Sequence, residues 1–136
     1  MKTIKLWLAT IATLLCNITA NAYDFEVDGI YYNIISSSDL IVEVTEGDID
    51  MYRGTVTIPE EVTYNGTDYC VTGIDYNTFN GCSDLTSIVI PGSVTSIQCY
   101  SFKNCTSLKE IIFEDGAESL YLGYDNHNSN SIGEGL

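Results

Sequence analysis

The feature that most constrains this chain is a direct internal repeat. Residues 71–93 and 94–116 are identical at seven of 23 positions, and the identities fall at apolar, turn and cysteine positions. A unit of this size cannot bury its apolar side alone, so successive units stack on one another. The repeat therefore predicts an extended surface made by stacking, with little reason to expect an enclosed catalytic pocket.

The recurring apolar residues predict the core of each unit. They are Val71/Val94, Ile74/Ile97, Phe79/Phe102, Cys82/Cys105, Leu85/Leu108 and Ile88/Ile111, with Ile90 matched by Phe113. Because side chains alternate along a strand, the residues between these core positions point outward. An upstream segment aligns with the same strand, with Val56 and Ile58 as its core residues. The outward positions of the three predicted strands are Thr55, Thr57, Ser87, Val89, Glu110 and Ile112.

Two β-hairpins are predicted ahead of the repeat. From residue 23 to about residue 46, aromatic and β-branched residues alternate with polar ones, and Asp28-Gly29 separates two strand-like runs. A two-residue turn of this kind needs positive φ, which Asp-Gly and Asn-Gly tolerate, so Asn65-Gly66 predicts a second hairpin. We expect residues 23–53 to form an N-terminal β-hairpin cap over the open edge of the first unit.

The segment 1–22 has the pattern of a secretory signal peptide. Lys2 and Lys5 precede an apolar run over 6–15, and Ala20-Asn21-Ala22 matches a small-x-small cleavage site. A transmembrane anchor is the competing interpretation, but the run is shorter than the ~20 residues that a spanning helix needs. We expect cleavage, a mature chain that begins at Tyr23, and no membrane insertion afterwards.

The charge of the chain excludes some partners. Its net charge of −14 becomes −16 when the signal segment and its two lysines are removed. Such an excess of acidic residues excludes a nucleic-acid role and argues against binding to an anionic membrane surface. The full chain is 45% apolar, which argues against disorder, and the mature chain is expected to fold as one domain.

The mature chain contains four cysteines, for which two interpretations are open. Cys82 and Cys105 occupy the same site in adjacent units, about 5 Å apart, which suits either a disulfide or a buried stack of thiols. Their recurrence with the apolar set favours the stack. Cys70 and Cys99 have no evident partner and are expected at the edge of the core.

Neither catalysis nor metal binding is predicted. No C-x-x-C motif occurs, and the single histidine, His127, lies in a segment rich in asparagine and serine that offers no rigid support for its ring. Acidic residues are numerous, but no pair is marked as buried face to face. We therefore expect no enzyme activity, no cofactor and no metal.

The repeat resembles the BspA-like leucine-rich repeats of bacterial surface proteins. The pattern FxxCxxLxxIxIPxxVxxI is carried by Phe79, Cys82, Leu85, Ile88, Ile90, Pro91, Val94 and Ile97. The resemblance implies a β-rich leucine-rich-repeat solenoid with short helical or 3-10 turns. The second unit departs from the pattern at Glu114, where Pro91 stands in the first, and at Gln98-Cys99, where the family often has glycine.

The same resemblance implies a function in recognition. Such a chain would be a secreted or cell-surface module for protein–protein interaction, with adhesion to a host extracellular protein as its role. The alternative is a structural spacer or stalk within a larger surface protein. Under the first hypothesis, the six outward residues from Thr55 to Ile112 form the binding face.

The register divides the chain into a series of units. We expect a partial unit at 54–70, repeats at 71–93 and 94–116, the start of a next unit at 117–122, and a polar segment at 123–136. The apolar register continues to Leu120, which lies one repeat length after Ile97. Because no further complete unit follows, we expect the chain to be an N-terminal fragment of a longer array.

Overall fold

The computed structural model describes residues 22–47, 52–116 and 119–123. The predicted signal peptide, apart from Ala22, and the segment that contains His127 lie outside these residues. The described ranges contain ten strands. They are β1 (Phe25–Val27), β2 (Ile30–Ser36), β3 (Ile41–Thr45), β4 (Gly54–Thr57), β5 (Glu61–Tyr64), β6 (Thr67–Ile74), β7 (Leu85–Ile90), β8 (Ser96–Ile97), β9 (Glu110–Phe113) and β10 (Tyr121–Leu122).

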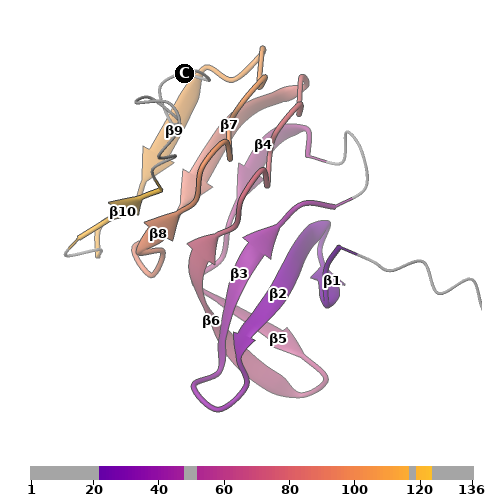
Figure 1. The fold of residues 1–136 in the computed structure, drawn as a ribbon, viewed down its shortest axis with the longest axis vertical. Helices are drawn as coiled ribbons and strands as arrows, with labels where there is room; N and C mark the ends of the chain where they lie inside the picture. Colours follow the sequence, from indigo (N-terminus) through magenta and orange to yellow (C-terminus); the bar gives the residue numbers. More distant parts are fainter. Residues whose placement is uncertain (1–21, 48–51, 117–118, 124–136) are drawn as a thin grey trace, which may run out of the picture.

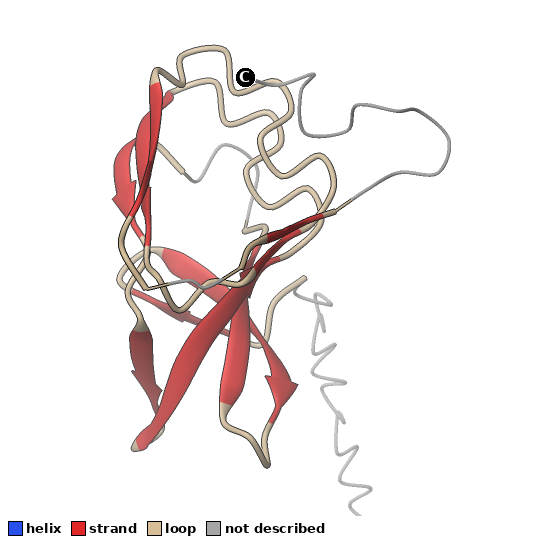
Figure 2. Ribbon diagram, turned by 90° about the vertical axis from the view of Figure 1, so that its left-hand side faces the viewer, coloured by secondary structure: helices blue, strands red, loops and turns tan. Residues whose placement is uncertain are grey.

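The strands form two sheets that share one core. The larger has the order β1-β2-β3-β6-β8-β10, with β5 paired to β6, and the smaller has the order β4-β7-β9. The strands β6, β8 and β10 are parallel to one another, as are β4, β7 and β9. Figure 1 shows these two parallel ladders beside each other, with the hairpins at one end. Figure 2 shows the small sheet on one side of the repeat region and the loops on the other.

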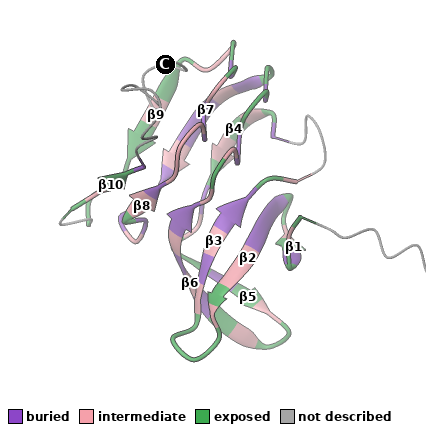
Figure 3. Ribbon diagram, viewed as in Figure 1, coloured by how far each residue is buried: buried purple, intermediate pink, exposed green. Residues whose placement is uncertain are grey.

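The spacing of the sequence repeat is also the spacing of the strand pairs. Ile88 pairs with Ile111 between β7 and β9, and Ile74 pairs with Ile97 between β6 and β8. The two members of each pair are separated by one repeat length, so equivalent side chains stack directly. Most of the predicted core is confirmed, with Leu108 and Ile111 partly buried. The prediction is wrong for Phe113, which is 54% exposed because β9 is the last strand of the small sheet among the described residues. Val56 pairs with Ile88, as the upstream alignment predicts. Among the strands, the buried residues are concentrated in β2, β3, β6 and β7 (Figure 3).

The loops between the two ladders are also bonded to one another. The backbone N–H groups of Asn77, Phe79 and Gly81 donate to the carbonyl oxygens of Cys99, Ser101 and Lys103 at 3.3, 2.8 and 2.8 Å. These bonds repeat the same step along the chain, so the first unit donates to the second on the loop side. At the ends of the sheet strands the direction is reversed, as where the Lys109 N–H donates to the Thr86 carbonyl oxygen at 2.9 Å. The described loops contain isolated turns and no helix, so the expected short helical turns are not confirmed.

Two buried hydroxyl groups satisfy backbone carbonyls at equivalent positions of adjacent units. The Thr78 Oγ1 atom donates to the carbonyl oxygens of Val44 and Asp75 at 3.1 and 2.7 Å. The Ser101 Oγ atom donates to those of Asp75 and Gln98 at 3.0 and 2.6 Å. A buried carbonyl without a partner is costly, so these hydroxyls allow the strand ends to enter the core.

One corner of the stack leaves no room for a side chain. A Cβ atom at Gly92 would lie 2.4 Å from the carbonyl oxygen of Asp115 and 2.7 Å from the Cα atom of Gly116. Only glycine therefore fits at this position.

The departure from the repeat pattern at Glu114 is explained by a backbone hydrogen bond near the same corner. The Glu114 N–H donates to the Ile90 carbonyl oxygen at 2.9 Å, a bond that a proline could not form.

Both predicted hairpins are present. Asp28 and Gly29 have φ values of 52° and 81°, and Asn65 and Gly66 have φ values of 50° and 77°. These left-handed pairs connect β1 to β2 and β5 to β6 in antiparallel register. The third strand of the first segment, β3, then pairs in parallel with β6. The hairpins therefore continue the larger sheet beyond the repeat units.

Tyr52 joins the hairpins to the repeat units. Its Oη atom donates to the Thr45 carbonyl oxygen at 2.8 Å and accepts from the Tyr31 N–H at 3.1 Å. Its ring lies 4.7 Å from that of Phe79, which stacks on Phe102 at 5.3 Å with an interplanar angle of 6°. The aromatic contacts thus run without a break from the hairpin segment into both repeats.

The register after the second repeat differs from the prediction. β10 pairs Leu122, not Leu120, with Ile97, so the spacing at this pair is longer than the repeat length. Leu120 still packs against the core, while Leu122 is exposed. The shift is by two positions, which keeps the alternation of side chains along the strand.

Replacement of Tyr52 by phenylalanine tests this junction. The variant retains the ring but leaves the Thr45 carbonyl and the Tyr31 N–H without their buried partner. We expect the free energy of unfolding to fall by about 1–3 kcal/mol, measured by urea denaturation. Tyr64→Phe is the matched control, because Tyr64 stacks on Phe25 at 4.2 Å and its hydroxyl makes no hydrogen bond among the described residues. Equal losses in both variants would contradict the role given to the Tyr52 hydroxyl.

Candidate binding surface

The six predicted face residues lie on one side of the small sheet. Thr55, Ser87 and Glu110 align across β4, β7 and β9 as one row. The second row lies two residues further along each strand and contains Thr57, Val89 and Ile112. The intervening residues, such as Ile88, point to the core. The structure therefore brings all six positions together, as the alternation predicts.

One of the six residues is less accessible than expected. Ser87 is only 7% exposed, and its Oγ atom donates to the Glu110 Oε1 atom at 3.2 Å. Ser87 belongs to the central strand, so neighbours on both sides cover it. The prediction that Ser87 is available on the surface is wrong, and Glu110 presents its carboxylate in that place.

The remaining residues give the face a mixed character. Thr55, Thr57 and Glu110 are exposed, Val89 is half-buried, and Ile112 is 43% exposed. Hydroxyl and carboxylate groups can fix the orientation of a partner, while Val89 and Ile112 offer apolar area.

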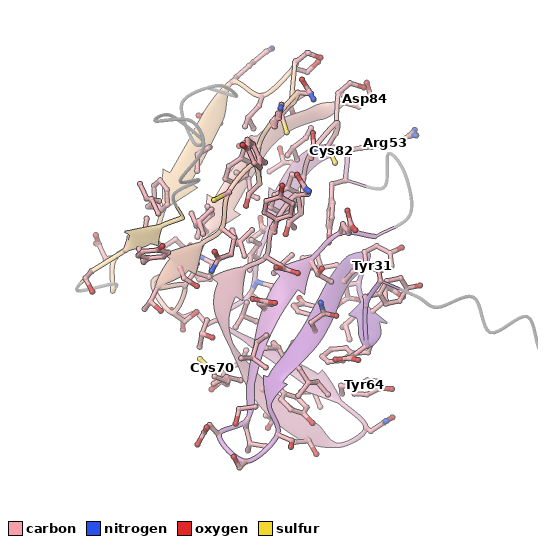
Figure 4. The ribbon with its side chains drawn as sticks, in the orientation of Figure 1. Tyr31, Arg53, Tyr64, Cys70, Cys82 and Asp84 are labelled. Atoms are coloured by element: carbon pink, nitrogen blue, oxygen red, sulfur yellow. The ribbon has the colours of Figure 1, made fainter. Side chains whose placement is uncertain are left out.

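The cysteines of the repeat form a stack of thiols. Cys82 and Cys105 are buried and are not joined by a disulfide, in agreement with the favoured interpretation. The Cys105 Sγ atom donates to the Phe79 carbonyl oxygen at 3.0 Å. Burial, together with the neighbouring Cys82, raises the pKa of the Cys105 thiol to about 11. Figure 4 shows Cys70 at the hairpin end, far from Cys82 in the repeat loops.

The larger sheet carries a carboxyl group with a perturbed pKa. Glu43 aligns with Gly73, which aligns in turn with Ser96. Partial burial, followed by repulsion from Asp75, raises the pKa of Glu43 to about 7. Asp75 itself accepts hydrogen bonds from the Thr45 hydroxyl at 3.2 Å and from the Tyr76 N–H at 2.6 Å. A negative charge nearby and partial burial both disfavour the ionised form of Glu43.

Sequence reasoning missed an apolar cavity at the end of the ladders formed by β9 and β10. It has a volume of about 520 Å³. Its apolar lining comes mainly from Ile97, Phe102, Leu108, Ile111, Leu120 and Leu122. Four of these six are core residues of the second repeat by alignment. The sequence therefore did contain a signal for this cavity, because the apolar side of a repeat unit stays uncovered unless another apolar layer packs on it.

The described ranges show neither a metal site nor a membrane span. No group of three or more histidine, cysteine, aspartate or glutamate residues in them is arranged to hold a metal ion. In the same part of the chain, no helix is long and apolar enough to cross a membrane.

Comparison with solved structures shows the class of protein to which this arrangement corresponds. A leucine-rich cell surface protein from Faecalibacterium prausnitzii A2-165 matches 74% of the chain with a TM-score of 0.60 and 28% identity. A leucine-rich repeat protein from Bacteroides ovatus ATCC 8483 matches 71% with a TM-score of 0.59 and 35% identity. The chain covers only 26% and 24% of these two proteins.

A shorter protein is matched over more of its length. The leucine-rich repeat protein from Bacteroides capillosus ATCC 29799 has a TM-score of 0.61 and 27% identity, and the match covers 72% of this chain and 69% of that one. No curated protein matches the chain in sequence. The strand-rich arrangement described above is therefore that of leucine-rich repeat proteins.

The family can be given more narrowly. Residues 71–124 match the family model described as a BspA type leucine rich repeat region (6 copies). This range begins at the first residue of the first complete repeat. The chain thus carries a leucine-rich repeat region of the BspA type, and the resemblance stated from the sequence is confirmed.

Thiol accessibility provides a test of the cysteine stack. At pH 8 we expect iodoacetamide to modify Cys70 and Cys99 in the native protein well before Cys82 and Cys105, because the latter are buried and reaction requires the thiolate. Peptide mapping by mass spectrometry measures the extent at each site. As a control, all four should react in urea without a reductant. Failure of Cys82 and Cys105 to react even then would indicate a disulfide.

The raised pKa of Glu43 predicts a pH dependence of stability. The folded-state pKa of about 7 lies above the ordinary value of 4.5, so the folded protein favours the protonated form. This contribution to stability is complete below about pH 4.5 and is lost as the pH rises through 7. Glu43→Gln should therefore match the wild type at pH 4 and exceed it by about 1 kcal/mol at pH 8, after allowance for solvent screening.

Chemical denaturation at both pH values measures this difference. The exposed Glu114 offers the matched control, since Glu114→Gln should give no such gain at pH 8. If the Glu43→Gln gain were the same at both pH values, burial of a titrating carboxyl would not be its cause.

Proposed function

We propose that the chain is a protein-interaction module that works at a bacterial cell surface and adheres to an extracellular protein of the host. The observation that carries the proposal is the alignment of two three-residue rows on the outward side of β4, β7 and β9. The family context supports it, because one of the matched structures is described as a leucine-rich cell surface protein. Leucine-rich repeat proteins are typically binding modules without enzyme activity.

The rest of the fold has a supporting role in this proposal. The repeat units form a short solenoid, with rung-to-rung bonds in both ladders and in the loops. The segment at 23–53 acts as its cap, since β1, β2 and β3 extend the larger sheet beyond β6 and Tyr52 packs against Phe79. A predicted signal peptide at 1–22 would direct the chain to secretion.

The size of the face limits its affinity. Three strands about 4.8 Å apart span only about 10 Å, whereas a stable interface buries about 800 Å² on each partner. A partner must therefore also contact the surface next to the face. This limit is also the observation that favours the alternative function, a spacer or stalk that displays another part of a larger protein.

The proposal is tested by substitutions at the apolar residues of the face. The double variant Val89→Asp/Ile112→Asp places two charges in the row that offers apolar area. Its binding to a panel of immobilised extracellular matrix proteins, measured by surface plasmon resonance, should fall by at least about tenfold. The wild-type protein must bind at least one member of the panel for this loss to be seen. If the wild-type protein binds none of them, the spacer function is supported.

A matched double variant controls for nonspecific effects. Ile35 and Leu40 are 53% and 42% exposed and lie on β2 and just before β3, away from the small sheet. Ile35→Asp/Leu40→Asp adds the same charge and should retain binding. Equal losses in the two double variants would mean that added negative charge, and not the face, accounts for the effect.

A further inference from the structure

We propose that the free edge of β4 binds an extended, basic segment of a partner protein as an added β-strand. β4 pairs with β7 on one side, and among the described residues no strand pairs with its other side. An open edge presents unpaired N–H and C=O groups, which an extended peptide can satisfy. The inference rests on the proposed function, protein binding, and names the chemistry of the partner.

The hydrogen bonds of β4 show which of its groups are open. The Gly54 N–H donates to the Asp84 carbonyl oxygen at 2.9 Å, and the Ile58 N–H donates to that of Val89 at 3.0 Å. In a parallel ladder, alternate residues direct both backbone groups to the same neighbour. The N–H and C=O groups of Thr55 and Thr57 therefore point away from β7. The side chains of both threonines are exposed.

Two cavities provide space beside this edge. They have volumes of about 410 and 270 Å³, and both are lined by Asp28, Ile30 and Thr57. The turn between β1 and β2 therefore forms the facing wall. Sequence reasoning did not predict this groove, because the hairpin and β4 are neighbours only in the fold.

The charges around the groove favour a basic segment. Asp28 lines both cavities and Glu61 lines the larger one, whereas Arg53 is their only basic residue. The Arg53 side chain extends outward from the molecule in Figure 4. The chain as a whole has a net charge of −14, which also attracts a cationic partner.

The apolar residues of the groove favour a partner segment that also carries apolar side chains. Ile30 lines both cavities, Val62 the larger and Val56 the smaller. Alternate side chains of an added strand point to opposite sides, so one set can contact these residues while the other meets the carboxylates. A strand with alternating β-branched and lysine residues has this chemistry.

A synthetic peptide tests the proposal directly. The probe is a labelled peptide of alternating valine and lysine, about eight residues long, and its partner is the mature protein. Fluorescence anisotropy at low salt should show saturable binding that weakens as salt is added. The peptide of alternating valine and glutamate should not bind.

Two substitutions at one position separate backbone from side-chain effects. Thr57→Pro removes the N–H that points to the groove. It removes no hydrogen bond to β7, and edge strands tolerate proline at such a position. It should weaken peptide binding by at least about tenfold, whereas Thr57→Val, which retains the N–H, should change it by less than about twofold. The unfolding temperature of each variant checks that it folds.

A measurement on the unsubstituted protein removes dependence on the proline variant. Hydrogen exchange at the Thr55 and Thr57 amides should slow when the valine–lysine peptide is added. The proposal is overturned if these amides are not protected, if Thr57→Pro binds as well as Thr57→Val, or if the glutamate peptide binds equally. Sedimentation of the protein as a dimer that Thr57→Pro dissociates would also overturn it, with a second copy as the occupant.

The outcome is separable from that of the proposed function. Val89→Asp/Ile112→Asp leaves the β4 edge intact, so this variant should still bind the peptide even where it loses the matrix protein. If peptide binding fails while matrix binding depends on Val89 and Ile112, only the strand-addition proposal is wrong. If the peptide binds but no matrix protein does, only the proposed face is wrong.

Discussion

The stacked rings of Phe79 and Phe102 are the contact on which the two complete repeats depend. The rings are nearly parallel, at 5.3 Å, and each lies in the middle of its unit between the two ladders. A phenyl ring buries a large apolar area, so a stacked pair in register stabilises the packing of one unit on the next. The backbone bonds from Phe79 to Ser101 and from Gly81 to Lys103 then form at that separation.

The same stack explains why the hairpin segment and the repeats share one core. Tyr52 contacts Phe79 with its ring and reaches Thr45 and Tyr31 with its hydroxyl. Burial raises the pKa of the Tyr52 phenol, so the group is a neutral hydrogen-bonding link between the two parts. The turn at Asp28 belongs to the same hairpin segment and lines both cavities beside β4.

Much of the fold follows from the sequence because the repeat fixes the register. The alignment of Val56 with Ile88 identifies β4, and Asp28-Gly29 and Asn65-Gly66 identify the hairpins from the backbone conformation that each turn needs. The six outward positions follow from alternation alone. The periodicity of the sequence does not predict contacts between segments that are distant along the chain and belong to different parts of the fold.

Only some departures from prediction have this origin. Ser87 is covered because Glu110 reaches across from β9. The pairing of Leu122 with Ile97 is a separate departure, because the spacing at this pair is two residues longer than the repeat. The contact of Tyr52 with Phe79 and the groove beside β4 depend on how the hairpin segment folds back. A signal for the buried hydroxyls did exist, since Thr78 and Ser101 recur at the same place in the repeat.

The loop-to-loop bonds have a mechanical consequence. The bonds of both ladders and those from residues 77–81 to residues 99–103 all run from one unit to the next. A pull along the stacking direction therefore loads the contacts between successive units in series, and separation begins at the weakest one. A pull along the strands loads the bonds of each ladder together in shear. A surface protein built in this way resists tension best when its strands lie along the line of force.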